Sequence, residues 1–422
     1  MSGTDDNTPT EAEKLGGPGP TTTESPEPTT PEPEAPSRSH SMLREIASGN
    51  ALAGVLAVVL AVAVGSLMIA LTDERVRETA TYVFARPGDF FTATWDAIWG
   101  AYTALFRGAV YNDRVDDLAA QIRPLTETLK FAAPLIAAGL GVGLAFRAGL
   151  FNIGGRGQML LAGAASGWVA ANVELPTALH LPLAIVAGMV AGALWAGIAG
   201  VLKARTGAHE VIVTIMLNYV GFYLVFYALS EQALLQAPGS GNPKSAPALE
   251  TATLPKILGE RFNLHLGFLL ALVAVAIVWW LLGRSTLGYR IRAVGENPSA
   301  ARASGIDVGR TYVVVMLIAG ALVGLAGANQ VLGTVTSGVT VDLDAGIGFD
   351  AITVALLGRS RPLGILLAGL LFGAFKAGGF AMQASEGIPV DIVLVVQSLI
   401  VLFIAAPPLV RAIFRLPAKE AK

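Results

Sequence analysis

Residues 146–165, FRAGLFNIGGRGQMLLAGAA, place glycines at positions 149, 154, 155 and 157, together with Asn152 and Gln158, between two strongly apolar runs. Glycine weakens a helix, and side-chain amides need hydrogen-bond partners. Backbone that leaves the helical pattern at membrane depth is tolerated only where protein buries it or water lines it. The stretch therefore predicts a helix interrupted inside a bundle; a plain turn with close glycine packing is the alternative interpretation.

The composition indicates the class of protein that contains this break. Charged residues make up 14% of the 422 residues and the mean hydropathy is +0.60, whereas soluble domains contain about 25% charged residues. A membrane protein in a lipid bilayer is therefore predicted. The formal net charge is −2 and no basic cluster alternates with aromatic residues, so nucleic acid is not an expected partner. The absence of cysteine excludes disulfides and thiolate metal sites.

Ten apolar segments approach the roughly 20 residues that a membrane-spanning helix needs. They are 49–71, 127–146, 157–173, 181–202, 209–229, 265–283, 311–332, 346–357, 362–382 and 389–406. Most lysines and arginines near the segment ends fall on one side, which the positive-inside rule assigns to the cytoplasm. We therefore predict an all-α, multi-pass protein of the cell membrane, with about ten transmembrane helices and both termini in the cytoplasm.

Two regions differ from these spans. Residues 1–40 are rich in Thr, Pro and Glu, which predicts a disordered cytoplasmic tail and leaves 41–422 as the membrane domain. The outer segment 72–126 carries many charges, and within it FFTATWDAIWGAYTALF (90–106) has apolar residues at helical spacing. A helix lying in the outer membrane interface is predicted at 90–106, with an eleventh span as the alternative.

A second interruption occupies the corresponding place in the second half of the chain. TVDLDAGIGFDAITVALLGRSRP, residues 340–362, also passes from a glycine-containing break into a short apolar segment. Five spans precede the loop 230–264 and five follow it, so the halves would be inverted, and paired breaks in inverted halves indicate a transport route. Polar and aromatic residues at the breaks and inside the spans are the predicted substrate contacts, with an interhelical hydrogen bond as the alternative for each: Phe151, Asn152, Gln158, Asn218, Tyr219, Asn329, Gln330, Phe349 and Asp350.

The cytoplasmic loop 284–310 contains a predicted short helix at 297–304. Asn297 is a suitable N-cap, Pro298 suits the first helical position and Gly305 can end the helix. A capped helix outside the membrane can pass force from a separate motor protein, whereas a plain loop with one helical turn is the alternative. Contact with such a motor is therefore assigned to Glu296, Asn297, Pro298, Ala300, Ala301, Arg302 and Gly305.

Six segments occur in a characteristic order: AGLFNIGGRGQMLL, HEVIVTIMLNY, PGSGNPKSAPAL, LGYRIRAVGENPSAARASGI, GFDAITVALLGRSRPLG and PVDIVLVVQSLIVLFIAAP. Together, over residues 124–410, they resemble the permease subunit of bacterial ATP-binding cassette (ABC) importers for nucleosides. The broader family includes permeases for simple sugars and branched-chain amino acids. The family usually has an acidic residue where this chain has Arg156, so no acidic role is expected there.

The resemblance implies three protein partners: a second permease subunit, a cytoplasmic ATP-binding subunit and an extracytoplasmic substrate-binding protein. It also implies that residues 297–304 contact the ATPase. ATP and magnesium are then expected on the ATPase, and no cofactor, metal or catalytic residue on this chain.

Other chemistry has little support in the sequence. There is no G-x-x-x-x-G-K-[ST] phosphate loop, so ATP hydrolysis by this chain is not expected. HEVIV, residues 209–213, lacks the second histidine of a zinc-protease site. An ion-coupled secondary transporter remains an alternative, but Lys376 is nearly the only deeply placed ionisable candidate for ion coupling. The function that the resemblance implies is the import of nucleosides, with simple sugars as the alternative substrate.

Overall fold

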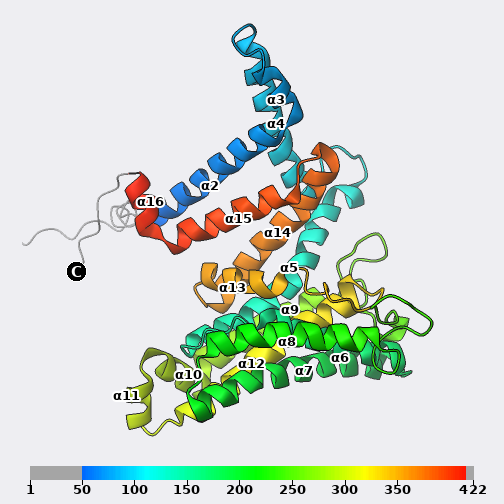
Figure 1. Cartoon of the computed structure of the whole chain (residues 1–422), viewed down its shortest axis with the longest axis vertical. Helices are drawn as coiled ribbons and strands as arrows, with labels where there is room; N and C mark the ends of the chain where they lie inside the picture. Colours follow the sequence, from blue (N-terminus) through cyan, green and yellow to red (C-terminus); the bar gives the residue numbers. More distant parts are fainter. Residues whose placement is uncertain (1–49, 415–422) are drawn as a thin grey trace, which may run out of the picture.

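The computed structural model describes residues 50–414, which fold almost entirely into helices (Figure 1). A helix occupies each of the ten predicted spans, and the described residues contain no β-strand. The ten are α2 (Asn50–Thr72), α5 (Leu118–Arg147), α6 (Gly155–Asn172), α7 (Thr177–Thr206), α8 (Glu210–Ser230), α9 (Gly267–Arg284), α12 (Val308–Asn329), α13 (Ile347–Leu357), α14 (Pro362–Glu386) and α15 (Val390–Ala405). The predicted tail, residues 1–40, lies outside the described residues.

Seven of these helices are long and apolar enough to cross a membrane, which makes the chain a multi-pass membrane protein: α2, α5, α7, α8, α9, α12 and α14. The other three differ for identifiable reasons. With 11 and 16 residues, α13 and α15 extend about 16 and 24 Å at 1.5 Å per residue, less than the roughly 30 Å of a bilayer core. In α6, neighbouring helices bury most residues, so glycine and alanine replace the large apolar side chains that lipid contact favours.

The helices of the two halves of the chain make corresponding contacts. α5 packs on α12, α7 lies along α12 and α14 lies along α5; α6 touches α12 and α13 touches α5. α8 packs on α6 and α7, just as α15 packs on α13 and α14. Exchanging α5–α8 with α12–α15 therefore leaves the set of contacts unchanged. The first helix of each half departs from the predicted five-plus-five repeat, because α9 packs on α5 whereas α2 packs on α15 (Figure 1).

Helix α5 forms the centre of the core. Every residue from 132 to 145 is buried, and the largest apolar cluster surrounds this segment. Small residues allow the close approach of backbones elsewhere: a Cβ added to Gly192 of α7 would lie 2.5 Å from the carbonyl oxygen of Gly320 in α12. Such glycine contacts let membrane helices associate by van der Waals packing.

The segment 72–126 folds into α3 (Glu74–Ala80), α4 (Pro87–Ala109) and the first turns of α5. The predicted helix at 90–106 is thus confirmed as a helix, and α4 is not among the seven that could span a membrane. Its second half packs on α14. Trp95 and Trp99 stack at 6.1 Å between ring centroids and are 64% and 62% exposed. Exposed tryptophan is typical of membrane–water interfaces.

Two short helices follow α9 at the same end of the bundle as the end of α5: α10 (Thr286–Glu296) and α11 (Pro298–Ala303) (Figure 1). The predicted helix at 297–304 corresponds to α11. The Asn297 side chain caps it by accepting hydrogen bonds from the N–H groups of Ser299 and Ala300, both at 3.0 Å. Helix α10 was not predicted, although Ser285 caps it and its apolar residues Ile291 and Val294 are buried.

Candidate functional site

The first break, residues 148–154, is held by one face of α8. Glu210, Thr214 and Asn218 are spaced four residues apart and therefore share that face. The Phe151 N–H donates to Glu210 Oε1 (3.4 Å), and the Ile153 N–H donates to Thr214 Oγ1 (3.2 Å). Asn218 Nδ2 donates to the Ile153 carbonyl at 2.9 Å. Protein groups thus satisfy the non-helical backbone, as membrane depth requires.

The first break reaches into the bundle. Asn218 Oδ1 also accepts from the N–H of Gly157, in the first turn of α6, at 2.8 Å. Asn218 lies eight residues after the start of α8, which is about 12 Å along the helix axis at 1.5 Å per residue. Helix α6 therefore begins about two turns along α8 instead of at its end.

Asn152 and Gln158 form a closed pair behind the first break. Their exposed fractions are 0% and 1%. Gln158 Nε2 donates to Asn152 Oδ1 at 3.0 Å, and the Gly154 N–H donates to the same oxygen at 3.0 Å. The pair fixes the turn from which α6 starts.

The variant Asn152→Leu keeps the side-chain volume but removes this acceptor. It leaves the Gly154 N–H and the Gln158 amide buried without a partner, at about 1–3 kcal/mol for each group. We expect a lower thermal midpoint together with weaker transport. The measurement is thermal unfolding and uptake per molecule in membranes. Uptake kinetics and stability equal to those of the unmodified chain would show that the amide pair has neither role.

The second break, residues 335–346, is held from several directions. Ser245, in the loop after α8, accepts from the Val339 N–H at 2.8 Å. Gln330 Nε2 donates to the Leu343 carbonyl at 3.2 Å. Lys376 of α14 donates to the Ala345 carbonyl at 2.8 Å. This break, like the first, returns the chain into the bundle before a helix starts.

The two breaks meet where α6 and α13 begin. A Cβ added to Gly155 would lie 2.5 Å from the carbonyl oxygen of Gly348, so the first turns of α6 and α13 touch backbone to backbone. Arg156, the next residue of α6, pairs with Asp344 of the second break at 3.5 Å between Nε and Oδ1. Its guanidinium also lies 5.1 Å from the ring centroid of Phe222. We call this meeting point the junction.

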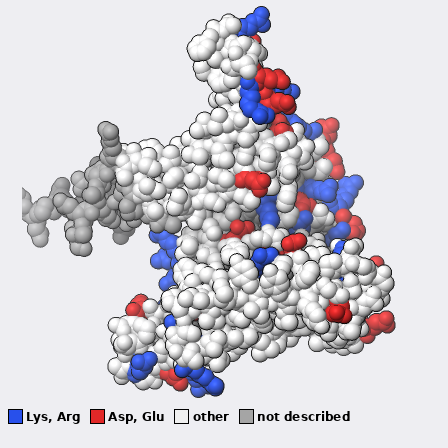
Figure 2. All heavy atoms as spheres, in the orientation of Figure 1, with Lys and Arg blue, Asp and Glu red and all other residues white. Residues whose placement is uncertain are grey.

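Charges at the junction are balanced. Asp344 is buried, whereas Asp350 and Lys376 are half-buried. The ammonium of Lys376 interacts electrostatically with the carboxylates of both aspartates. Most of the surface between the two charged ends of the bundle is uncharged in Figure 2. Two cations and two carboxylates inside the bundle thus form a polar region, and such intramembrane charges usually mark a substrate or ion pathway.

The structure brings some of the predicted contact residues together and separates others. Phe349 and Asp350 lie in the first turn of α13. Tyr219 is 61% exposed, on the outside of α8, and Phe151 is 41% exposed and stacks on Phe146 at 4.6 Å. Asn329 and Gln330 lie at the far end of α12 from α10. The contact of these residues with a substrate remains a prediction.

Sequence reasoning missed the roles of Arg156 and Asp344 at the junction. The departure at Arg156 was visible, but its partner was not, because 188 residues separate the two. Lys376 was noted only as an ionisable residue in a span. The sequence offered two signals of a charged site: an arginine and a lysine in apolar segments, and acidic residues at the second break.

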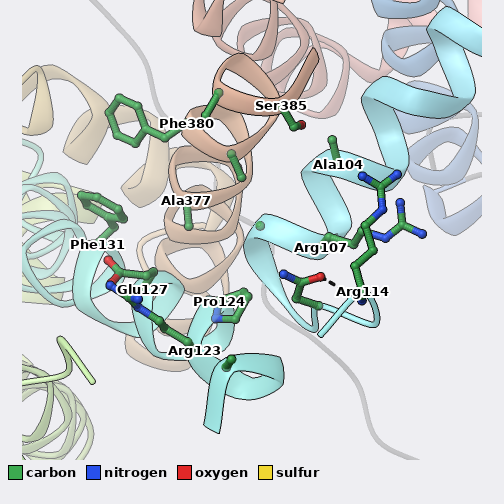
Figure 3. A pocket seen from close by; sticks show the side chains of 15 residues that line it. Ala104, Arg107, Arg114, Arg123, Pro124, Glu127, Phe131, Ala377, Phe380 and Ser385 are labelled. Carbon is green, nitrogen blue, oxygen red and sulfur yellow. Dashed lines mark hydrogen bonds between the residues drawn. The ribbon is translucent and has the colours of Figure 1, made fainter. Parts of the chain in front are cut away.

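A cavity of about 760 Å³ opens between α4, α5 and α14 (Figure 3). Phe131 and Phe380 line one side, with ring centroids 5.7 Å apart, and Arg107 and Arg114 line the other. Phe380 lies one helical turn from Lys376 on the same face of α14. No residue of the junction lines this cavity.

The first break also touches the end of α10. A Cβ added to Gly149 would lie 3.5 Å from the Gly295 backbone, and one added to Gly295 would overlap the Arg147 carbonyl. Gly149 has φ +73°, a conformation that favours glycine. No side chain separates α10 from the turn that leads into the first break.

Comparisons with known proteins match the chain to one family. The family model described as "Branched-chain amino acid transport system / permease component" matches residues 125–405. The chain is 35% identical to the guanosine ABC transporter permease protein of Bacillus subtilis, over 85% of this chain and 94% of that protein. It is 36% identical to the nucleoside ABC transporter permease protein of Lactococcus lactis, over 74% and 84%. It is 39% identical to the glucose ABC transporter permease protein of Haloferax volcanii, over 66% and 75%. No solved structure matches the chain.

Proposed function

The chain belongs to the family of branched-chain amino acid transport system permease components, and we propose on that premise that it is the membrane permease of an ATP-driven importer for nucleosides. One observation supports a transport role above all: two interrupted helices meet at a charged junction inside the bundle. The similarity to a guanosine permease along almost its whole length supports the substrate class.

The junction also supports a second permease subunit as a partner. Phe349 is 49% exposed and Asp350 and Lys376 are half-buried, so this face of α13 and α14 is open in the isolated chain. Charged side chains that face lipid are costly. A second permease laid against this face would cover the charges and enclose the route between the two subunits.

The proposed orientation places α10 and α11 in the cytoplasm of a bacterial cell and the loop 231–266 outside. It follows from the basic residues near the span ends. Single cysteines at Arg292, Arg361 and Lys419 should react with a thiol reagent only from the cytoplasm, and one at Gly241 only from outside. The chain has no cysteine of its own, so the background is clean. If Arg361→Cys were labelled from outside in sealed cells, the proposed orientation would be wrong.

We propose that α10 and α11 contact the ATPase. Six of the residues assigned to this contact from the sequence are exposed, and so is Ala303 of α11: Glu296, Asn297, Pro298, Ala300, Arg302 and Gly305. Ala301, also assigned to this contact from the sequence, is only 4% exposed and packs with Val294 and Val308. Its place in the contact is therefore indirect, through the position of α11.

A bulky residue on the exposed side of α11 should weaken this contact. We expect Ala303→Trp to leave membrane abundance unchanged but to reduce copurification of the ATPase and substrate-stimulated hydrolysis by about tenfold, equivalent to about 1.4 kcal/mol. Arg205→Trp, exposed at the end of α7, is the matched control. Equal copurification of both variants would remove α11 from the contact. Ala301→Trp serves a different purpose, because it would overpack the internal cluster.

The substrate proposal is tested by uptake into vesicles that contain this permease with its ATPase, second permease and binding protein. Guanosine uptake that requires ATP is the expected result. Unlabelled glucose serves as a competitor, because a glucose permease is also among the relatives. Uptake driven by a proton or sodium gradient without ATP would favour a secondary transporter instead.

A further inference from the structure

The end of the bundle opposite α10 and α11 contains buried polar side chains that lack hydrogen-bond partners. Within residues 50–414, eight buried side-chain nitrogen and oxygen atoms have no such partner, and four of them lie here. They are Nε2 of His265, both amide atoms of Asn329 and Oγ1 of Thr334. Two of the remaining four, on Arg156 and Glu210, have ion-pair partners instead. We call His265, Asn329 and Thr334 the unpartnered cluster.

The three residues of the unpartnered cluster come from two neighbouring segments. Asn329 ends α12 and Thr334 ends the π-helical turn Gln330–Thr334 that follows. His265 packs its ring on Gly333 of that turn, where a Cβ would lie 2.5 Å from the ring. The Asn329 amide packs on Gly267, two residues after His265. Single π-turns often occur at functional sites.

The protonation state of His265 can be derived from its contacts. Burial, together with the positive charge of Lys130, lowers the pKa of His265 to about 4, so the ring is neutral near pH 7. The Gly267 N–H donates to Nδ1 at 3.3 Å, so Nδ1 is the unprotonated nitrogen. The proton is therefore on Nε2, and this N–H donor has no acceptor.

A cavity of about 640 Å³ adjoins the unpartnered cluster. His265, Gly333 and Thr334 form part of its wall, and most of its other lining residues are polar or charged. Three of the four charged side chains in the lining are paired, Lys256 with Glu260 at 2.7 Å and Lys130 with Glu127 outside the lining, whereas Glu250 is exposed and has no ion pair among the described residues. The volume lies within the roughly 300–1,000 Å³ of small-molecule sites. The paired charges and the unpaired neutral donors and acceptors favour a neutral, hydrogen-bonding solute, and the exposed Glu250 carboxylate disfavours an anion.

We propose that this cavity is a substrate subsite for a neutral solute rich in hydroxyl or amide groups, such as a nucleoside. The choice of nucleoside rests on the proposed function. The His265 Nε2–H and the Thr334 hydroxyl bind the solute at the wall, and the Asn329 amide, which does not itself line the cavity, packs against Gly267 in the same cluster. Buried polar groups without partners are costly to keep. Occupation of the subsite supplies the missing partners, with a small movement of the π-turn.

The test measures guanosine binding by the assembled transporter in lipid nanodiscs, using the thermal midpoint with and without guanosine. Asn329→Leu and Thr334→Val remove hydrogen-bonding atoms but keep the side-chain shape. We expect both variants to be as stable as the unmodified chain, or more stable, without guanosine. We expect the guanosine-dependent shift to be lost and the apparent affinity to fall at least tenfold. Ser166→Ala, which removes another unpartnered hydroxyl far along the chain in α6, is the matched control and should keep the full shift.

The outcomes separate this proposal from the substrate assignment. If the unmodified chain responds to guanosine and both variants keep the response, the cluster holds only water and the subsite is refuted. If the unmodified chain shows neither guanosine uptake nor a shift, the nucleoside assignment fails, and glucose replaces guanosine as the probe for the same variants. Loss of the glucose response in Asn329→Leu and Thr334→Val would then support the subsite, and its retention would refute it.

Discussion

Gly155→Val should abolish uptake and lower the abundance of the folded chain. The added side chain would begin 2.5 Å from the carbonyl oxygen of Gly348, and the neighbouring atoms are also backbone. Backbone atoms inside two helices cannot rotate away as a flexible side chain can. We therefore expect a destabilisation of about 3 kcal/mol or more, at the upper end of the range for overpacking.

The measurement for Gly155→Val is thermal unfolding in membranes together with uptake per molecule. Gly283→Ala is the matched control, because this glycine lies inside α9 and a Cβ there would meet no atom within 4 Å. The control should be neutral or more stable by about 0.5–1 kcal/mol, since alanine is the better helix former. Normal stability and uptake in Gly155→Val would mean that α6 and α13 do not touch as described.

Lys376→Met should also stop transport. The cause is the loss of a positive charge, whereas Gly155→Val acts by steric overlap. Methionine keeps much of the apolar stem but removes the donor to the Ala345 carbonyl and the cation beside Asp344 and Asp350. Lys376 is only half-buried and forms no direct ion pair among the described residues, so we expect a cost below the roughly 3–5 kcal/mol of breaking a fully buried pair. We expect a lower thermal midpoint and little or no uptake.

A double-mutant cycle identifies the source of the Lys376→Met effect. Adding Asp350→Asn should restore part of the lost stability, with an interaction energy of about 0.5–3 kcal/mol. Lys256→Met is the control, because its partner Glu260 is 90% exposed and a surface pair contributes about 0–1 kcal/mol. Additive effects of Lys376→Met and Asp350→Asn would show that the two charges do not interact.

Local patterns were sufficient to predict most of the helices. Apolar length located a helix at each of the ten predicted positions, seven of them long and apolar enough to span a membrane, and an N-cap with a following proline located α11 from Asn297 and Pro298. Helix ends were less accurate: α5 begins at Leu118, nine residues before the predicted span. The missed turns, residues 118–126, include Arg123 and Pro124, and Asp117 caps them by accepting from the Ala119 N–H. A hydropathy pattern cannot register such a cap.

The site was harder to predict than the fold. Sequence reasoning found both breaks and expected them to be related, but their contact depends on residues far apart in the chain. The same limit applies to α8. Asn218 was selected as a polar residue in a span, whereas its hydrogen bonds to the first break follow only from the packing of α8 on α6. Composition identifies polar residues in apolar helices, and tertiary packing decides what they bind.

The contact between Gly295 and the turn at Arg147–Gly149 has a mechanical consequence. Side chains in ordinary relays can absorb a displacement by changing rotamer, so a stroke applied at one end fades along the relay. Here two backbones press directly on each other, and α10 acts as a short lever whose tip rests on the entrance to the first break. A movement of the end of α10 must therefore be accommodated either by the turn at 147–149 or by bending of α10 itself, because no side chain lies between the two backbones.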